Sequence, residues 1–304
     1  MSLNNGSLFF LPVKYDKINV KSIRFGQDVK KVEPFRGGSH LLALTPWIDA
    51  YENVAAGITV RSGGFSQKPY QSLNMGFHVN DDNETVRQNR STVSKTLGIP
   101  TARWTGTEQV HKAEIRKITA KDAGMGAMDL ETAFKGTDGV YTTEKDLLLT
   151  SLYADCVPLY FFDPSKKIAG LAHAGWKGTA LNIGGELVKK WVIDENADKD
   201  GILAAIGPSI GSCCYEVDEY VMSRMNEALG SRTDAAAKKV SAGKYMLDLK
   251  EANRQLLIAS GLKETNIVVS DYCTSCRNDL FFSYRKDGGT TGRMMSYIML
   301  KGDS

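Results

Sequence analysis

The chain has 304 residues, of which 42% are hydrophobic and 24% are charged, and its formal net charge is +3. This composition is typical of a globular protein with a sizeable core, and the length fits one large domain or two ordinary ones. The small charge, spread along the chain, argues against nucleic acid as a partner, and no apolar stretch reaches the roughly 20 residues that a membrane span needs. Because no signal-peptide pattern opens the sequence, we expect a cytoplasmic protein with neither a nucleic-acid nor a membrane partner.

Residues 1–45 are predicted to form an N-terminal extension, followed by one domain over residues 46–304. Within the extension we expect a strand pair near residues 18–26 and a glycine break at Gly37 and Gly38. Apolar density rises from Val54, where VAAGITVRSGG predicts a buried strand that ends in a glycine turn.

The next elements are one helix and three buried strands. DDNETVRQNRSTVSKTLGIP predicts a helix, because acidic residues open it, apolar residues recur at helical spacing, and Gly98 with Pro100 stops it. The runs LLLTSLYA, VPLYFF and IAGLAHA are almost continuously apolar, which is typical of strands buried on both faces.

The second half of the chain mixes helices and strands. GWKGTALNIGGELVKKWVI predicts a helix behind a glycine turn, and VDEYVMSRMNEAL and LKEANRQLLIAS predict two more. ILAAIGP, NIVVS and RMMSYIML predict strands. Since the order is not a strict βαβ alternation, we predict an α+β fold, a single mixed domain of packed β-sheets flanked by helices.

The candidate chemistry centres on one cysteine and the histidines. His78, His111 and His173 lie in glycine- or polar-flanked turns, whereas His40 lies in the extension with nothing near it. His111, Cys156 and His173 could hold a catalytic zinc, which takes three protein ligands and keeps a fourth position open. Equally, Cys156 could be a nucleophile with a histidine as its base, or a buried core residue. The residues alone leave these three interpretations open.

Two further motifs suggest anion binding. In HAGWKGT, Gly175 and Gly178 bracket Trp176 and Lys177 at a strand-to-helix junction, where free backbone N–H groups suit phosphate. Arg61, in VRSGGFS, could add a bidentate phosphate contact. A plain chain reversal and a solvated strand end are the alternatives.

The other four cysteines carry a weaker signal. Cys273 and Cys276 form a lone CTSC, and Cys213 and Cys214 are adjacent. Together they could form a second zinc site of four thiolates, but we expect reduced structural thiols, because adjacent cysteines rarely bind one metal together.

Seven motifs in sequence resemble the YfiH/YlmD family, formerly called laccase-domain or multicopper polyphenol oxidase proteins. The match runs from about Val54 to Leu300, and its motifs are RSGGFSQKPYQSLNMGFHVNDDNETVRQNR, EQVH, GTDGVYT, ADCVPLYF, HAGWKGT, AIGPSIGSCCYEV and CTSCRNDLFFSYRKDGGTTGRM. The resemblance implies a single mixed α+β domain with one zinc bound by His111, Cys156 and His173. One departure is Asn80, where most members have glycine or a similar small residue.

The resemblance also implies an activity. Adenosine, inosine, guanosine or S-methyl-5'-thioadenosine would react with phosphate to give the free base and a ribose 1-phosphate, and adenosine would be deaminated at the same site. His78 is then our candidate acid or base, since histidine titrates near neutral pH, and Arg61 and the backbone from Gly175 to Gly178 are the candidates for phosphate.

Three alternatives remain beside this activity. The first is a Cys–His hydrolase. The second is a copper-dependent polyphenol oxidase; copper is the alternative metal, although a multicopper cluster needs more imidazoles than four histidines supply. The third is a metal-stabilised partner module without catalysis. The sequence predicts no particular oligomeric state.

Overall fold

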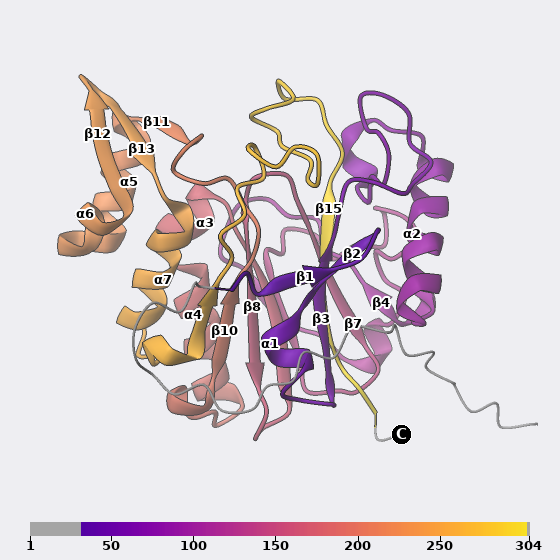
Figure 1. The fold of residues 1–304 in the computed structure, drawn as a ribbon. Coiled ribbons are helices and arrows are strands. Elements are labelled where there is room, and N and C mark those ends of the chain that lie inside the picture. Colours follow the sequence, from indigo (N-terminus) through magenta and orange to yellow (C-terminus); the bar gives the residue numbers. More distant parts are fainter. Residues whose placement is uncertain (1–31, 303–304) are drawn as a thin grey trace, which may run out of the picture.

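Two six-stranded mixed sheets, stacked face to face, form the centre of the computed structural model, which describes residues 32–302 (Figure 1). The strand pair expected near residues 18–26 lies outside the described residues. The first sheet has the order β1 (Phe35–Gly37), β2 (Leu41–Leu44), β3 (Val54–Thr59), β15 (Met294–Leu300), β7 (Leu148–Tyr153), β4 (Trp104–Thr105). The second has the order β14 (Ile267–Val269), β10 (Leu203–Ile206), β8 (Val157–Asp163), β9 (Ile168–Ala174), β6 (Gly139–Thr142), β5 (Ile115–Lys117).

Helices cover the outer faces of both sheets. Figure 1 shows α2 on one side and α4 with α7 on the other. The helices are α1 (Thr45–Ile48), α2 (Asn83–Leu97), α3 (Trp176–Ala180), α4 (Ile183–Asp194), α5 (Glu219–Leu229), α6 (Thr233–Ala236) and α7 (Leu249–Ala259). A small third sheet, β11 (Glu216–Asp218), β13 (Lys244–Leu247) and β12 (Ala237–Ser241), lies beside α5 and α6. The predicted α+β fold, a single mixed domain of packed sheets and helices, is confirmed.

The alternating direction of side chains along each strand explains why the protein has a hydrophobic core on either face of the second sheet. In β8, Tyr160 and Phe162 belong to the core between the sheets, whereas Leu159 and Phe161 pack in the core beneath α4 and α7. Because successive side chains of a strand point to opposite faces, an uninterrupted apolar run fills both cores at once. The three buried strands predicted from such runs are confirmed as β7, β8 and β9.

Local signals set the helix ends. Asp82 accepts a hydrogen bond from the N–H of Thr85 at the start of α2, and Gly98 ends the helix with a φ of 69°. Asn80 has a φ of 64°, in the left-handed region that asparagine tolerates. The single helix predicted over residues 175–193 is instead α3 and α4, because Asn182 adopts a φ of 52° and caps α4 through Gly185.

The predicted boundary between an N-terminal extension and the domain at residue 45 is wrong in part. Within the segment predicted as an extension, β1 and β2 extend the first sheet, and β2 pairs with β3. Phe35 is fully buried against Tyr160. Residues 35–44 therefore belong to the folded unit, since an isolated apolar strand gains stability only by pairing and burial.

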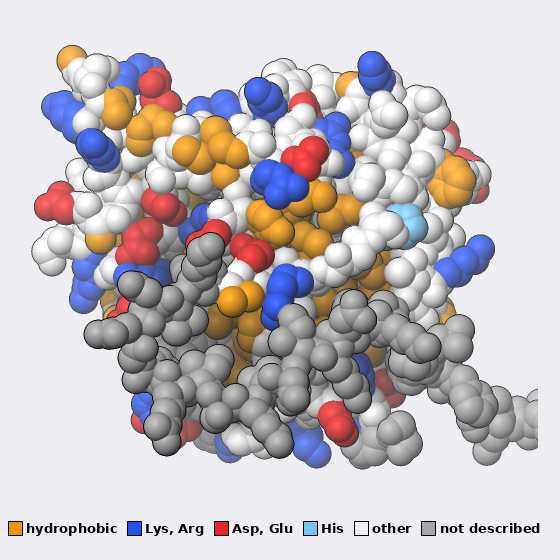
Figure 2. Space-filling model, viewed as in Figure 1, with side chains coloured by type: hydrophobic (Ala, Val, Ile, Leu, Met, Phe, Trp, Pro, Cys, Tyr) orange, Lys and Arg blue, Asp and Glu red, His pale blue; other side chains and the backbone are white. Residues whose placement is uncertain are grey.

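The surface matches the mixed charge of the sequence. On the face shown in Figure 2, lysine and arginine side chains are interspersed with aspartate and glutamate and form no continuous basic stripe. Among residues 32–302, no helix combines the length and apolar character that crossing a membrane requires.

Candidate metal centre

The hairpin of β8 and β9 places two of the predicted ligands side by side. Cys156 directly precedes β8, His173 lies within β9 rather than in a turn, and the register pairs Val157 with Ala174 and Pro158 with His173. The chain reaches Cys156 from β7 through Asp155, whose φ of 84° produces a tight turn. Antiparallel pairing thus brings the start of one strand to the end of the other.

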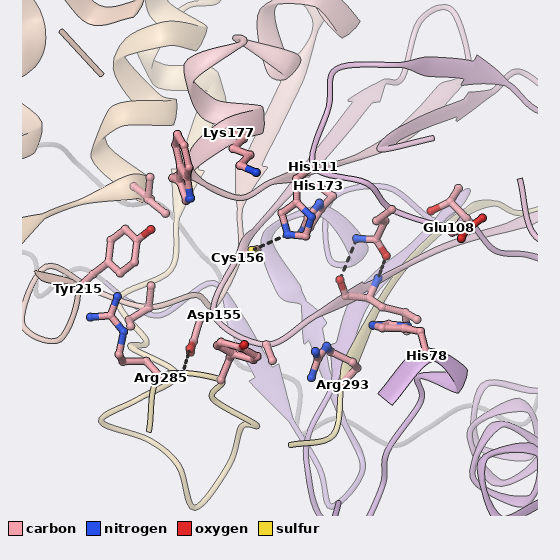
Figure 3. Close-up of a pocket in the computed structure, with 18 of the residues that line it drawn as sticks. His78, Glu108, His111, Asp155, Cys156, His173, Lys177, Tyr215, Arg285 and Arg293 are labelled. Carbon is pink, nitrogen blue, oxygen red and sulfur yellow. Dashed lines mark hydrogen bonds between the residues drawn. The ribbon is translucent and has the colours of Figure 1, made fainter. Parts of the chain in front are cut away.

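The third predicted ligand, His111, comes from the loop between β4 and β5. Its Nε2 lies 4.0 Å from the Cys156 Sγ, and its ring centroid is 4.7 Å from that of His173 (Figure 3). The three ligand atoms all lie within 4.8 Å of one another. A tetrahedral ion with nitrogen and sulfur ligands holds such atoms roughly 3.4–3.8 Å apart, so small side-chain rotations would complete the site.

Asp138, just before β6, orients His173. Its Oδ1 is 2.9 Å from the His173 Nδ1, which leaves Nε2 to face the other ligands. The same carboxylate accepts hydrogen bonds from the backbone N–H groups of Val110, His111 and Lys112. One buried carboxylate therefore positions both histidine ligands, as is usual for metal-bound imidazoles.

Electrostatics favour a thiolate at Cys156. Burial opposes its ionisation, but the neighbouring His173 and the hydrogen bond from His111 lower the pKa of Cys156 to about 6. Conversely, although burial disfavours the charged imidazole, Cys156 and Asp138 raise the pKa of His173 to about 9. Without a metal the pair would be a thiolate and an imidazolium; a bound cation would replace the imidazolium proton.

The glycines of HAGWKGT make room for the ligands. A Cβ on Gly175 would lie 2.9 Å from the Cys156 Sγ and 3.1 Å from the His111 Cδ2. A Cβ on Gly178 would lie 2.9 Å from the carbonyl oxygen of His173. Close packing explains both glycines, so their predicted role in phosphate binding is not needed to account for them.

The ligands open into a cavity of about 660 Å³, which is in the range of small-molecule sites. Cations and aromatic rings both line it. Figure 3 shows Lys177, Arg285 and Arg293 on different sides of the three ligands, with His78 next to Arg293 and Tyr215 next to Arg285. The side chains of Arg285 and Arg293 donate hydrogen bonds to backbone carbonyl oxygens, which are uncharged, so their positive charges remain available to an anion.

The prediction that Arg61 contacts phosphate needs correction, because Arg61 does not line this cavity. Its Nη1 donates to the carbonyl oxygen of Asn278 at 2.8 Å and lies 3.7 Å from the Asp287 carboxylate, and its guanidinium stacks on Phe282. The end of β3 therefore directs Arg61 into the loop 278–287 and not toward His111, Cys156 and His173.

His78 does line the cavity, but with a different ionisation from the one we predicted. Desolvation in the cavity wall, followed by the positive charges of Arg293 and Arg90, lowers the pKa of His78 to about 4. The side chain is therefore neutral at pH 7.

Two residues of the candidate site were not predicted from the sequence. Asp138 stands inside the motif GTDGVYT, and an acidic residue directly before a strand was a usable signal. Arg293 stands inside GRM, directly before β15. Their roles depend on contacts with distant segments, which the linear spacing does not reveal.

Comparison with known proteins agrees with this geometry. Residues 55–301 match a family model described as multi-copper polyphenol oxidoreductase laccase. Purine nucleoside phosphorylase YlmD of Geobacillus stearothermophilus is 48% identical over 248 residues, which cover 82% of this chain and 90% of that protein. Purine nucleoside phosphorylase YlmD of Bacillus subtilis is 45% identical over 263 residues, 86% of this chain and 94% of that protein. The chain belongs to the YlmD/YfiH family.

A solved structure of the YlmD/YfiH family has the same fold. The crystal structure of the hypothetical protein YfiH from Bacillus licheniformis superposes with a TM-score of 0.86 at 44% identity, over 88% of this chain and 99% of that one. The resemblance predicted from the seven motifs is confirmed. The laccase name fits the ligands poorly, because two imidazoles and one thiolate suit a single ion and not a cluster of coppers.

Proposed function

We propose that this protein is a zinc-dependent purine nucleoside phosphorylase that also deaminates adenosine. The observation that carries the proposal is the set of three ligands, one of them oriented by Asp138, at the wall of a cavity rich in cations. The names of the YlmD relatives support phosphorolysis. The substrates would be adenosine, inosine, guanosine or S-methyl-5'-thioadenosine, together with phosphate.

His111, Cys156 and His173 would hold the metal, and Asp138 would keep His173 in the correct tautomer. Zinc suits this donor set, and with an open fourth position it supplies Lewis acidity and activates water for deamination. The exposed His111 borders the open cavity, whereas His173 is buried, so substrate would approach from the His111 side.

Arg293 and Lys177 would bind phosphate. The Nη1 of Arg293 donates to the carbonyl oxygens of Thr291 and Gly292, which fixes the guanidinium at the cavity wall. Fixed guanidinium groups suit phosphate oxygens, and the ammonium of Lys177 adds a second positive charge. This proposal replaces the one for Arg61.

The purine would pack against the aromatic wall of the cavity. Trp176, Tyr215 and Tyr284 line it, and Arg285 stacks on Tyr215 with 5.1 Å between its guanidinium carbon and the ring centroid. Aromatic side chains stabilise a planar base by stacking. Because His78 is neutral at pH 7, it would act as a base or a neutral hydrogen-bond partner of the ribose or base, and not as an imidazolium acid.

One observation favours a second candidate, a cysteine hydrolase. The lowered pKa of Cys156 beside His173 is what an activated thiol nucleophile requires. A hydrolase has no need of a third ligand, however, and His111 lies 4.0 Å from the same sulfur. We therefore favour the metal.

The test is product analysis with metal-analysed protein. Adenosine is incubated with and without phosphate, and chromatography separates adenine, ribose 1-phosphate and inosine. We expect adenine only with phosphate, inosine without it, and loss of both in Cys156→Ala and His111→Ala. His40→Ala is the matched control, because His40 is the histidine that does not line the cavity.

Other outcomes would decide against the proposal. Full turnover by metal-free protein, abolished by alkylation of Cys156, would establish the hydrolase. No turnover of any nucleoside by metal-replete protein, combined with unfolding on metal removal, would establish a metal-stabilised partner module.

A further inference from the structure

A second cluster of sulfur atoms lies apart from the three cavity ligands. Cys213 and Cys214 come from the loop 207–215 after β10, and Cys273 and Cys276 from the segment after β14. The Cys276 Sγ is 3.4 Å from the Sγ atoms of both Cys213 and Cys214, and all four sulfur atoms lie within 4.8 Å of one another. None of these free thiols takes part in the proposed function.

The backbone brings the two segments together at this point. Ser209 and Cys273 form a β-bridge, and the N–H of Thr274 donates to the carbonyl oxygen of Ser209 at 3.0 Å. The N–H of Gly211 points at the Cys273 Sγ from 3.2 Å. A backbone N–H directed at a cysteine sulfur stabilises its thiolate, which is the form that binds metal.

The spacing of the sulfur atoms fits one ion better than a disulfide. Four thiolates around zinc, with zinc–sulfur bonds of about 2.3 Å, stand roughly 3.8 Å from each other. Two of the observed separations are 3.4 Å, and all of them lie within 4.8 Å, so small side-chain shifts would reach that value. A disulfide would join only two of the sulfur atoms and would draw them to about 2.05 Å, whereas Cys276 is equally close to two partners.

We propose that Cys213, Cys214, Cys273 and Cys276 bind a second zinc ion in a closed site of four thiolates. Soft sulfur donors select zinc among the common divalent cations, and four protein ligands leave no position for substrate, so the ion is structural. This proposal revises the expectation of metal-free structural thiols. It goes beyond the phosphorylase proposal, and only the expected total of two ions per chain rests on the cavity zinc as well.

The ion would hold one wall of the cavity in place. Ile210 and Tyr215 on the first segment and Tyr284 and Arg285 on the second line the cavity. Both segments also bond to Asp155, next to Cys156: the Ile210 N–H donates to its carbonyl oxygen, and the Arg285 N–H donates to its carboxylate at 2.7 Å. Joining the segments at their cysteines would therefore position the aromatic wall relative to the cavity metal.

Metal counting on the full chain tests the proposal. The protein is loaded with zinc under reducing conditions, desalted, and its zinc per chain measured by mass spectrometry. We expect two ions in the parent chain, one in Cys156→Ala and one in Cys276→Ser. Cobalt added to Cys156→Ala should give the intense absorption of a tetrahedral cobalt thiolate, and cobalt added to Cys276→Ser should give the weaker bands of one sulfur ligand.

Three results would overturn the second site. The first is an unchanged zinc content in Cys276→Ser. The second is a Cys156→Ala protein that retains no metal after zinc loading and whose four remaining thiols all react with a thiol reagent. The third is a disulfide among the four cysteines in protein kept reduced. Since Cys276 is exposed, its serine variant should fold, and circular dichroism checks this. If it unfolds, the cobalt spectrum of Cys156→Ala decides alone.

Discussion

At the scale of single residues, neighbours decide what each ionisable side chain can do. Asp138 is not one of the three candidate metal ligands, yet its carboxylate accepts one hydrogen bond from the His173 ring and three from the backbone around His111. Arg61 and Arg293 are both arginines near glycines, but only Arg293 lines the cavity. Residue type alone did not distinguish these two arginines, because the position of each one at the end of its strand decides where the side chain points.

Replacing Arg293 should weaken phosphate binding selectively. In Arg293→Gln we expect the apparent KM for phosphate to rise about 10- to 100-fold, corresponding to roughly 1.4–2.7 kcal/mol, because a charge-assisted contact is lost. The KM for nucleoside should change little. Steady-state kinetics at varied phosphate measures this, with the exposed Arg232→Gln as control. An unchanged phosphate KM would refute the assignment.

His78 should remain neutral well below the ordinary titration range. Its pKa in the folded protein is about 4, against an ordinary value of 6.5, so the unfolded chain takes up the proton first as pH falls. The free energy of unfolding should therefore decrease as pH falls from about 6.5 toward 4, and part of that decrease should vanish in His78→Gln. Urea unfolding of both proteins at several pH values measures it, and NMR titration of the His78 ring gives the pKa directly. A ring pKa near 6.5 would contradict the prediction.

At the scale of elements, the junction of β9 and α3 is built around the three candidate metal ligands. His173 is near the end of β9, Gly175 is the N-cap of α3, and Lys177 in the helix lines the cavity. The junction needs a residue without a side chain, because the sulfur of Cys156 and the ring of His111 occupy the space beside it.

Gly175→Ala should weaken metal binding while preserving the fold. The added methyl group would lie 2.9 Å from the Cys156 Sγ, so the thiolate must shift from its position between the histidines. We expect at least about a 10-fold loss of zinc affinity in the cavity site, the range seen when the surroundings of a ligand are disturbed. Competition with a chelator measures the affinity. Gly201→Ala is the matched control, since nothing lies within 4 Å of a Cβ there; equal losses in both variants would refute the steric argument.

At the scale of the whole molecule, the stacked sheets bring distant parts of the chain to one cavity. Cys156 lies where the chain passes from β7 of the first sheet to β8 of the second. His111 and Asp138 arrive from segments flanking β5 and β6 at the edge of the second sheet, and Arg293 arrives with β15 in the first. The site is therefore a property of the stacking and not of either sheet.

The first two strands should be essential to that stacking. A chain that begins at residue 46 would lack β1, β2 and the buried Phe35, whose loss alone costs about 3–5 kcal/mol by analogy with large-to-small core substitutions. We expect its thermal unfolding midpoint to lie well below that of a chain that begins at Val32. Equal midpoints in calorimetry would restore the boundary at residue 45 that the sequence predicted.

The family, the fold class and the three residues that meet at the cavity could be predicted from the sequence, because strand periodicity and short motifs are local. Apolar runs predicted β7, β8 and β9, and three of the motifs contained His111, Cys156 and His173. Only the tertiary structure showed that Asp138 orients His173, that Arg293 rather than Arg61 reaches the cavity, and that four cysteines from two segments meet. Each of these depends on the direction of a side chain between segments far apart in the chain, and packing decides that direction.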